Sequence, residues 1–161
     1  FSNLLGWQNL IGYVPQKIFI LDDSLKNNIL FGLDEKNYPD ETIYELIKKI
    51  NLEILLNRLP NGLDGNLGEK GLNLSGGEIQ RIGICRALIY DPEILFLDEA
   101  TSSLDTFTES QILNELNTIK AKTTISVAHR INTLRNCDKI YFVDDGKIID
   151  EGSFDKFSVK N

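Results

Sequence analysis

The stretch Ile94-Leu95-Phe96-Leu97-Asp98-Glu99-Ala100 decides the fold class of this chain. Four consecutive apolar residues between polar ones are typical of a strand that is buried on both faces of a parallel sheet. Apolar periodicity predicts a helix before this strand, from about 78 to 90, and another after it, from about 106 to 120. A further strand is predicted from 124 to 128. This alternation of strands and helices predicts an α/β fold.

The rest of the chain adds one strand, more helices and a hairpin. A short strand is predicted from Asn9 to Val14, and Asp40 is expected to cap a helix that a second helix, from Leu52 to Leu59, follows. The mostly helical stretch from about Lys17 to Arg86 is expected to form a subdomain on one side of the sheet. A hairpin from Lys139 to Glu151 is predicted to form an antiparallel edge of the sheet.

Composition and charge narrow the class of protein. The 161 residues are 42% hydrophobic and 25% charged, which suits one domain with a core. The formal net charge of −7 argues against a nucleic-acid partner, because phosphate backbones require a basic surface. No apolar run approaches the ~20 residues that span a bilayer. Cys85 and Cys137 lack metal-ligand spacing and fit reduced thiols.

Polar residues follow three predicted strands at the point where each strand ends. Asp98 and Glu99 follow the strand ending at Leu97, His129 follows the next strand, and Gln16 follows the first one. Ligands of open α/β sheets bind beyond the carboxyl ends of the strands, so these side chains are expected to converge.

Phosphoryl transfer to water is the chemistry that needs this set. Mg²⁺ prefers oxygen ligands and retains waters, so Asp98 could hold it. Glu99 could act as general base on the attacking water. His129 could contact a γ-phosphate, and the Gln16 amide could orient the water and the metal.

The segment Leu74-Ser75-Gly76-Gly77-Glu78 begins the predicted helix and has two readings. Serine followed three residues later by glutamate is a capping box, which needs no ligand. Two glycines in the first turn are unfavourable for a helix, yet they let a phosphate approach the exposed backbone amides. Both readings stay open on these residues alone.

Together these stretches resemble the nucleotide-binding domain of ATP-binding cassette (ABC) transporters. The resemblance covers essentially the whole chain, and it implies a partial P-loop NTPase-like core with a helical subdomain. Its parts occur in the family's order: YVPQ (Tyr13 to Gln16) as the Q-loop, LSGGEIQR (Leu74 to Arg81) as the signature, ILFLDEA (Ile94 to Ala100) as Walker B, SSLD (Ser102 to Asp105) as the D-loop, and AHR around His129 as the switch histidine.

The resemblance implies roles for the residues at the strand ends. Asp98 would hold Mg²⁺, with Gln16 beside the metal, Glu99 would activate water, and His129 would contact the γ-phosphate of ATP. Gln16 would also connect the site to the transmembrane domains. It further implies three segments: 1–16 as core strand and Q-loop, about 17–90 as helical subdomain, and about 91–161 as α/β core.

The resemblance also implies that two such domains face each other head to tail, in an expected homodimer. Ser75, Gly76, Gly77 and Glu78 would contact the partner's nucleotide, and Asp105 would couple the two sites. Glu78 departs from the glutamine that is more frequent in the family. Its carboxylate adds negative charge near a bound nucleotide.

A glycine-rich loop ending in Gly-Lys-Ser/Thr, which the family uses to bind phosphate, does not occur in the sequence. The resemblance places this loop before the Q-loop, so we expect it upstream of Phe1. The chain alone is therefore expected not to hydrolyse ATP.

Three functions stay open. LGEKGLNLSGGE (Leu67 to Glu78) and the DEATSSLD wording resemble exporters, which would place the protein at the cytoplasmic face of the inner membrane. LDDSLKNNI (Leu21 to Ile29) resembles lipid-linked oligosaccharide flippases and peptide exporters, so the cargo could be such a lipid or a peptide. The alternatives are a soluble cassette ATPase of translation or DNA repair, and a truncated, non-catalytic interaction module. Intact Glu99, His129 and Ser75 argue against the last.

Overall fold

The computed structural model describes residues 6–7, 10–68, 71, 74–101, 104–118 and 123–158, with the backbone alone for 117 and 118. None of its helices, within these residues, is long and apolar enough to cross a lipid bilayer. The elements, in chain order, are β1 (Ile11–Val14), α2 (Leu25–Leu30), α3 (Asp40–Lys49), α4 (Glu53–Arg58), α5 (Gly76–Leu88), β2 (Ile94–Asp98), α6 (Thr106–Thr118), β3 (Thr123–Val127), β4 (Ile140–Asp144), β5 (Lys147–Gly152) and α7 (Phe154–Ser158).

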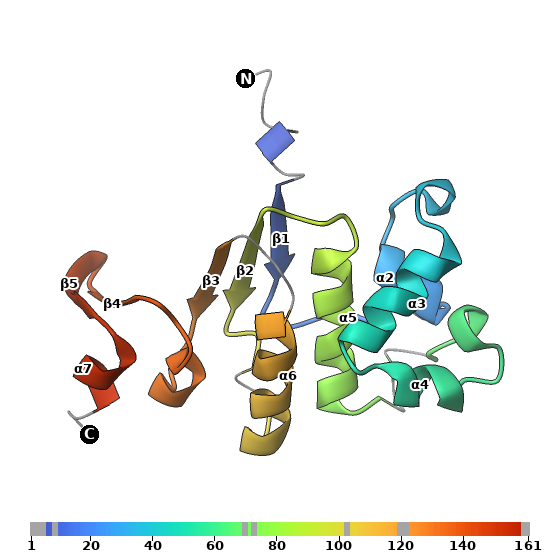
Figure 1. The fold of residues 1–161 in the computed structure, drawn as a ribbon. Coiled ribbons are helices and arrows are strands. Elements are labelled where there is room, and N and C mark those ends of the chain that lie inside the picture. The colour runs from blue at the N-terminus through green and yellow to red at the C-terminus, as the bar shows by residue number, and fades with distance from the viewer. Residues whose placement is uncertain are drawn as a thin grey trace.

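The centre of the fold is a parallel sheet with the strand order β1-β2-β3 (Figure 1). Its strands confirm the α/β prediction, and their boundaries fall within two residues of those expected. In β2 only alternate side chains are buried: Leu95 and Leu97 enter the core, whereas Ile94 and Phe96 are half-buried. The expectation of burial on both faces is therefore wrong for the described residues, because successive strand side chains point to opposite faces and the core lies on one of them.

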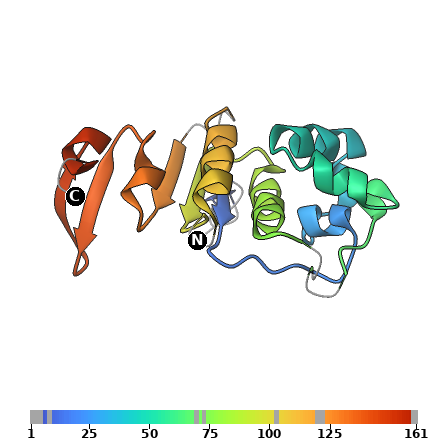
Figure 2. The same ribbon diagram turned by 90° about the horizontal axis from the view of Figure 1, so that it is seen from below.

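Helix α5 lies between the sheet and the group formed by α2, α3 and α4 (Figures 1 and 2). A glycine in β1 allows the close approach: a Cβ added at Gly12 would lie 2.3 Å from the Ala87 carbonyl oxygen. The buried face of α5 contributes Ile82, Ile84 and Leu88 to one continuous core with β2 and the other helices. Helix α5 thus packs directly against the sheet.

The expected helices after residue 40 are present, but Asp40 does not cap the first of them. Pro39 is the N-cap of α3, and Asp40 is its first helical residue. Its carboxylate pairs with Lys26 of α2 at 2.7 Å instead. The Asp40 side chain therefore forms a tertiary ion pair and not the local helix cap that was predicted from the sequence.

Helix α2 was not predicted from the sequence, and a buried polar residue explains why it forms. Asn28 is fully buried, and its side-chain amide donates to the carbonyl oxygens of Leu21, Asp23 and Ser24. Arg86 of α5 donates to the Asn28 carbonyl and side-chain oxygens. These hydrogen bonds satisfy backbone carbonyl oxygens in and before α2. Hydrophobic periodicity carries no information on such bonds, so this helix could not be predicted from it.

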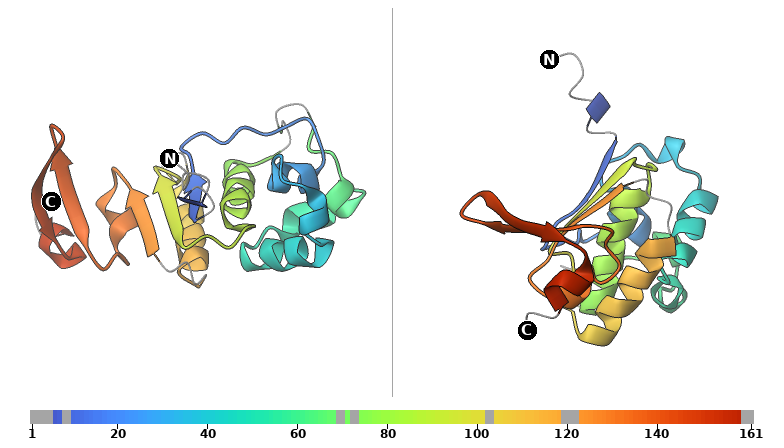
Figure 3. Two further views of the ribbon diagram at one scale, coloured as in Figure 1. Left: turned by 90° about the horizontal axis from the view of Figure 1, so that it is seen from above. Right: turned by 60° about the vertical axis from the view of Figure 1, so that its left-hand side comes forward.

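Strands β4 and β5 form the predicted hairpin, with Asp145 and Gly146 both at positive φ in its turn. The hairpin is a separate two-stranded sheet, so the expected antiparallel edge of the parallel sheet is wrong. It lies with α7 beyond β3, at the end of the molecule opposite the α2–α4 group (Figure 3). Hydrogen bonding, which decides strand order, cannot be read from the hairpin pattern alone.

Candidate functional site

The register of the parallel sheet brings the predicted residues at the strand ends together. Val14 lies opposite Leu97, and Asp98 lies opposite Val127. Gln16 comes two residues after Val14, and Glu99 comes two residues after Leu97. The three strands run in one direction, so their carboxyl ends meet at one edge of the sheet (Figure 1).

Glu99 lies at the centre of this cluster and contacts both neighbours. The Gln16 Nε2 donates to Glu99 Oε2 at 2.6 Å. The His129 Nε2 is 2.5 Å from Glu99 Oε1, within hydrogen-bonding distance. Each oxygen keeps a further lone pair for another donor, such as a water.

The backbone of Glu99 adopts a conformation that non-glycine residues rarely have. Its φ is 47°, in the left-handed region. Its N–H donates to the Val127 carbonyl oxygen at 3.1 Å, which attaches the end of β2 to β3. Strained residues of this kind occur where the fold holds a side chain in a required direction.

Asp98 precedes Glu99 and has an aromatic partner that the sequence analysis missed. The Tyr13 hydroxyl of β1 donates to Asp98 Oδ2 at 2.8 Å. This hydrogen bond, with the nearby negative charge, raises the pKa of Tyr13 above its ordinary value. The period of two along YVPQ could have placed Tyr13 on the face opposite the buried Val14.

The oxygens at the strand ends suit a magnesium ion, which needs only one or two protein ligands. They do not form a complete set of protein ligands for a metal. The described residues contain no group of three or more His, Cys, Asp or Glu that could hold a metal. Asp98 offers a hard carboxylate oxygen, and the Gln16 amide oxygen is left over by the bond from Nε2 to Glu99. Mg²⁺ commonly takes one or two such ligands and completes its shell with waters and phosphates.

The second predicted cluster begins α5, and both halves of its capping box are present. Ser75 Oγ accepts from the Glu78 N–H at 3.2 Å, and Glu78 Oε2 accepts from the Ser75 N–H at 2.7 Å. The prediction of a capping box in this segment is therefore confirmed. The box does not use the N–H groups of Gly76, which is exposed, and Gly77, which is buried. The first N–H groups of a helix have no intrahelical acceptor.

The two glycines lie beside the start of α6. A Cβ added at Gly77 would lie 2.8 Å from Thr108 Cγ2, whereas one at Gly76 would meet Leu104 at an ordinary 3.5 Å. Packing against α6 is thus a second reason for glycine at position 77.

Asp105 caps the same helix, α6. Its Oδ1 accepts from the N–H groups of Phe107 and Thr108, and its Oδ2 accepts from the Thr108 hydroxyl. The Thr108 bonds, the hydroxyl first, lower the pKa of the Asp105 carboxyl. The predicted coupling residue therefore has a local structural role as well.

A buried carboxylate that the sequence analysis overlooked links these segments. Glu109 is 6% exposed and accepts from the hydroxyls of Thr101 at 2.9 Å and Thr133 at 2.6 Å. Arg130 pairs with it at 3.3 Å and also donates to the Leu104 carbonyl. Glu109 thus connects the segment after Walker B, the start of α6 and the segment after His129.

Several predicted positions lie outside the described residues. These are Ser102 and Ser103 of the D-loop stretch and, before the signature, Glu69, Lys70, Leu72 and Asn73.

Parallel strands whose ends gather acid, amide and histidine groups, in a fold that also has a glycine-rich helix start packed against α6, are features of a nucleotide-binding domain. The "ABC transporter" family model matches residues 4–102, more than half of the sequence. The chain belongs to the ABC transporter family.

Similar proteins support the exporter type. An export ATP-binding/permease protein of Rickettsia typhi is 44% identical over 91% of this chain and 25% of its own length. The ABC multidrug transporter mdr1 of Aspergillus fumigatus is 40% identical over 94% of this chain and 11% of its own. A bacterial Atm1-family ABC exporter, solved with ATP bound, matches with a TM-score of 0.84 at 36% identity, over 98% of this chain and 28% of that one. The predicted P-loop NTPase-like ABC fold is thereby confirmed. The chain spans between 11% and 28% of the length of these relatives.

Proposed function

We propose that this chain is the part of an ABC exporter that helps to bind ATP and activates the water that hydrolyses it. The observation that carries the proposal is the position of Glu99, whose two carboxylate oxygens are held by Gln16 and His129. A carboxylate fixed in this way is a suitable general base, a role typically worth ~10²–10⁴-fold in rate.

Each residue at the strand ends has a distinct task in this proposal. Glu99 takes the proton of the attacking water, and His129, which is largely exposed, contacts the γ-phosphate. Asp98 and the Gln16 amide oxygen would hold Mg²⁺, which would supply positive charge to neutralise the phosphates. Tyr13 keeps the Asp98 carboxylate in place.

The start of α5 binds the nucleotide of a second copy. Ser75, Gly76 and Gly77 present a hydroxyl and backbone N–H groups at the positive end of a helix dipole, and Glu78 stabilises that helix start. Asp105, at the start of the neighbouring α6, couples the two sites. The expected assembly is a homodimer of such domains beside transmembrane domains, at the cytoplasmic face of the inner membrane, with no nucleic-acid partner.

The segments 1–16, about 17–90 and about 91–161 remain our proposed division of the domain. The cargo class is proposed from Leu21 to Ile29 as a lipid-linked oligosaccharide, another lipid or a peptide.

The test uses what we call the completed domain: this chain preceded by an ABC-family segment that carries a Gly-Lys-Ser/Thr loop. Glu99→Gln is expected to abolish ATP turnover while ATP binding persists. Glu41→Gln, an exposed residue in the first turn of α3, is the matched control and should leave turnover unchanged. Turnover that persists in Glu99→Gln would show that another group activates the water.

A further inference from the structure

Glu78 places a negative charge in the helix turn that the proposed function assigns to phosphate binding. Its side chain is only 15% exposed, and the capping box holds its carboxylate against the Ser75 N–H. An anion at this position opposes a second anion, because both compete for the same positive end of the α5 dipole. An unneutralised carboxylate here would weaken phosphate binding.

Arg58, the last residue of α4, neutralises this charge. Its Nη2 lies 3.2 Å from Glu78 Oε1 and 3.3 Å from Glu78 Oε2, so one nitrogen bridges both oxygens. The contact joins residues twenty positions apart, and it fastens the end of α4 to the start of α5.

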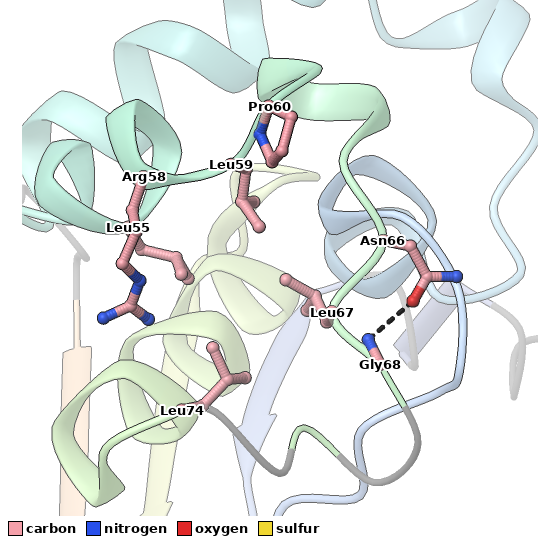
Figure 4. A pocket seen from close by; sticks show the side chains of 8 residues that line it. All are labelled: Leu55, Arg58, Leu59, Pro60, Asn66, Leu67, Gly68 and Leu74. Atoms are coloured by element: carbon pink, nitrogen blue, oxygen red, sulfur yellow. Dashed lines mark hydrogen bonds between the residues drawn. The ribbon is translucent and has the colours of Figure 1, made fainter.

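A pocket of about 420 Å³ separates the rest of α4 from the segment before α5. Arg58 lies at its border with Leu55 and Leu59, and Leu74 lines it from the α5 side (Figure 4). The Arg58–Glu78 pair is therefore a specific contact between two elements that are not closely packed at this point.

Stability alone does not explain the pair. The Arg58 side chain is 51% exposed, and exposed ion pairs contribute little to folding free energy because water and salt screen them. The charge of Glu78 also acts on an anion bound at this helix start, because it lies within the first turn, where the helix dipole acts.

We infer that Arg58 is a positioning residue of the signature site, which neutralises Glu78 and directs its carboxylate into the capping box, away from the phosphate of the partner's ATP. The inference rests on the proposed function. It explains how this chain combines a glutamate with a phosphate-binding helix start.

A double-mutant cycle in the completed domain tests it, with Glu99→Gln present in every variant so that ATP is bound and not consumed. The readout is the ATP concentration that gives half-maximal dimer formation by size-exclusion chromatography. Arg58→Gln is expected to raise this concentration roughly two- to tenfold. With Glu78→Gln also present, the same substitution should change it less than about twofold, because no charge remains to be neutralised. Arg58→Lys should stay close to the parent, since a single nitrogen makes both contacts.

The inference is overturned if Arg58→Gln changes the half-maximal ATP concentration equally with and without Glu78→Gln. It is also overturned if Arg58→Gln changes this concentration in neither background. Gly76→Asp separates this failure from a failure of the proposed function. Its Cβ has room beside Leu104, and it adds a charge to the same turn. If Gly76→Asp leaves dimer formation unchanged, the start of α5 does not bind phosphate, and the proposed function fails at this site. If Gly76→Asp weakens dimer formation and Arg58→Gln does not, only the role of Arg58 is wrong.

Discussion

Replacement of Glu109 by alanine is expected to lower the free energy of unfolding of the completed domain by about 2–4 kcal/mol. The Glu109 carboxylate is nearly buried and accepts hydrogen bonds from Thr101, Thr133 and Arg130. Alanine removes all of these bonds at once.

The magnitude follows from the surroundings of each partner. A hydrogen bond to a charged acceptor contributes about 1.5–3 kcal/mol, and the Thr101 hydroxyl, on a residue 5% exposed, would lose its partner away from water. The Arg130 side chain is 53% exposed and can be hydrated again, so its share is small. Glu109→Gln keeps one acceptor oxygen and should lose only about 1–2 kcal/mol.

Urea unfolding followed by circular dichroism measures the effect as a lower transition midpoint with an unchanged slope. Glu151→Ala is the matched control, because Glu151 forms an exposed pair with Lys139 and should change stability by less than about 1 kcal/mol. A loss in Glu109→Ala no larger than in Glu151→Ala would refute the reasoning, since the buried network would then contribute nothing.

Three further predictions concern backbone strain, thiol reactivity and pH. Glu99→Gly should be more stable than Glu99→Ala by about 1 kcal/mol in urea unfolding, because glycine tolerates the φ of 47°; equal stabilities would argue against strain. Burial raises the pKa of Cys85 to about 12, so iodoacetamide at pH 8 should label Cys137 in the folded domain and Cys85 only after unfolding. Rapid labelling of folded Cys85 would contradict its burial. The pKa of Asp105 is lowered, so its stabilising effect is complete above the unfolded-state pKa near ~3.9 and is lost as the pH falls through the folded-state value. The difference in melting temperature between the parent and Asp105→Asn should shrink over that acidic range, and a constant difference would exclude a titrating cap.

The kind of fold and the polar residues at three strand ends could be predicted from the sequence, whereas the contacts of Tyr13 and Glu109 could not. The apolar run before Asp98 predicts a strand, and the positions of Gln16, Glu99 and His129 directly after three predicted strands indicated that they converge. The capping box at Ser75 could also be predicted, because it depends on residues three positions apart. These features follow from local periodicity and from a general rule of parallel sheets.

The contacts between distant segments depend on the three-dimensional packing of the elements. Arg58 meets Glu78 across twenty positions, Tyr13 meets Asp98 across 85, and Asp40 leaves its expected cap for Lys26. Side-chain pairing at such separations depends on how helices and strands pack, and periodicity carries no information on packing. For the same reason the strand order, and with it the separate hairpin, became known only when the chain was folded in three dimensions.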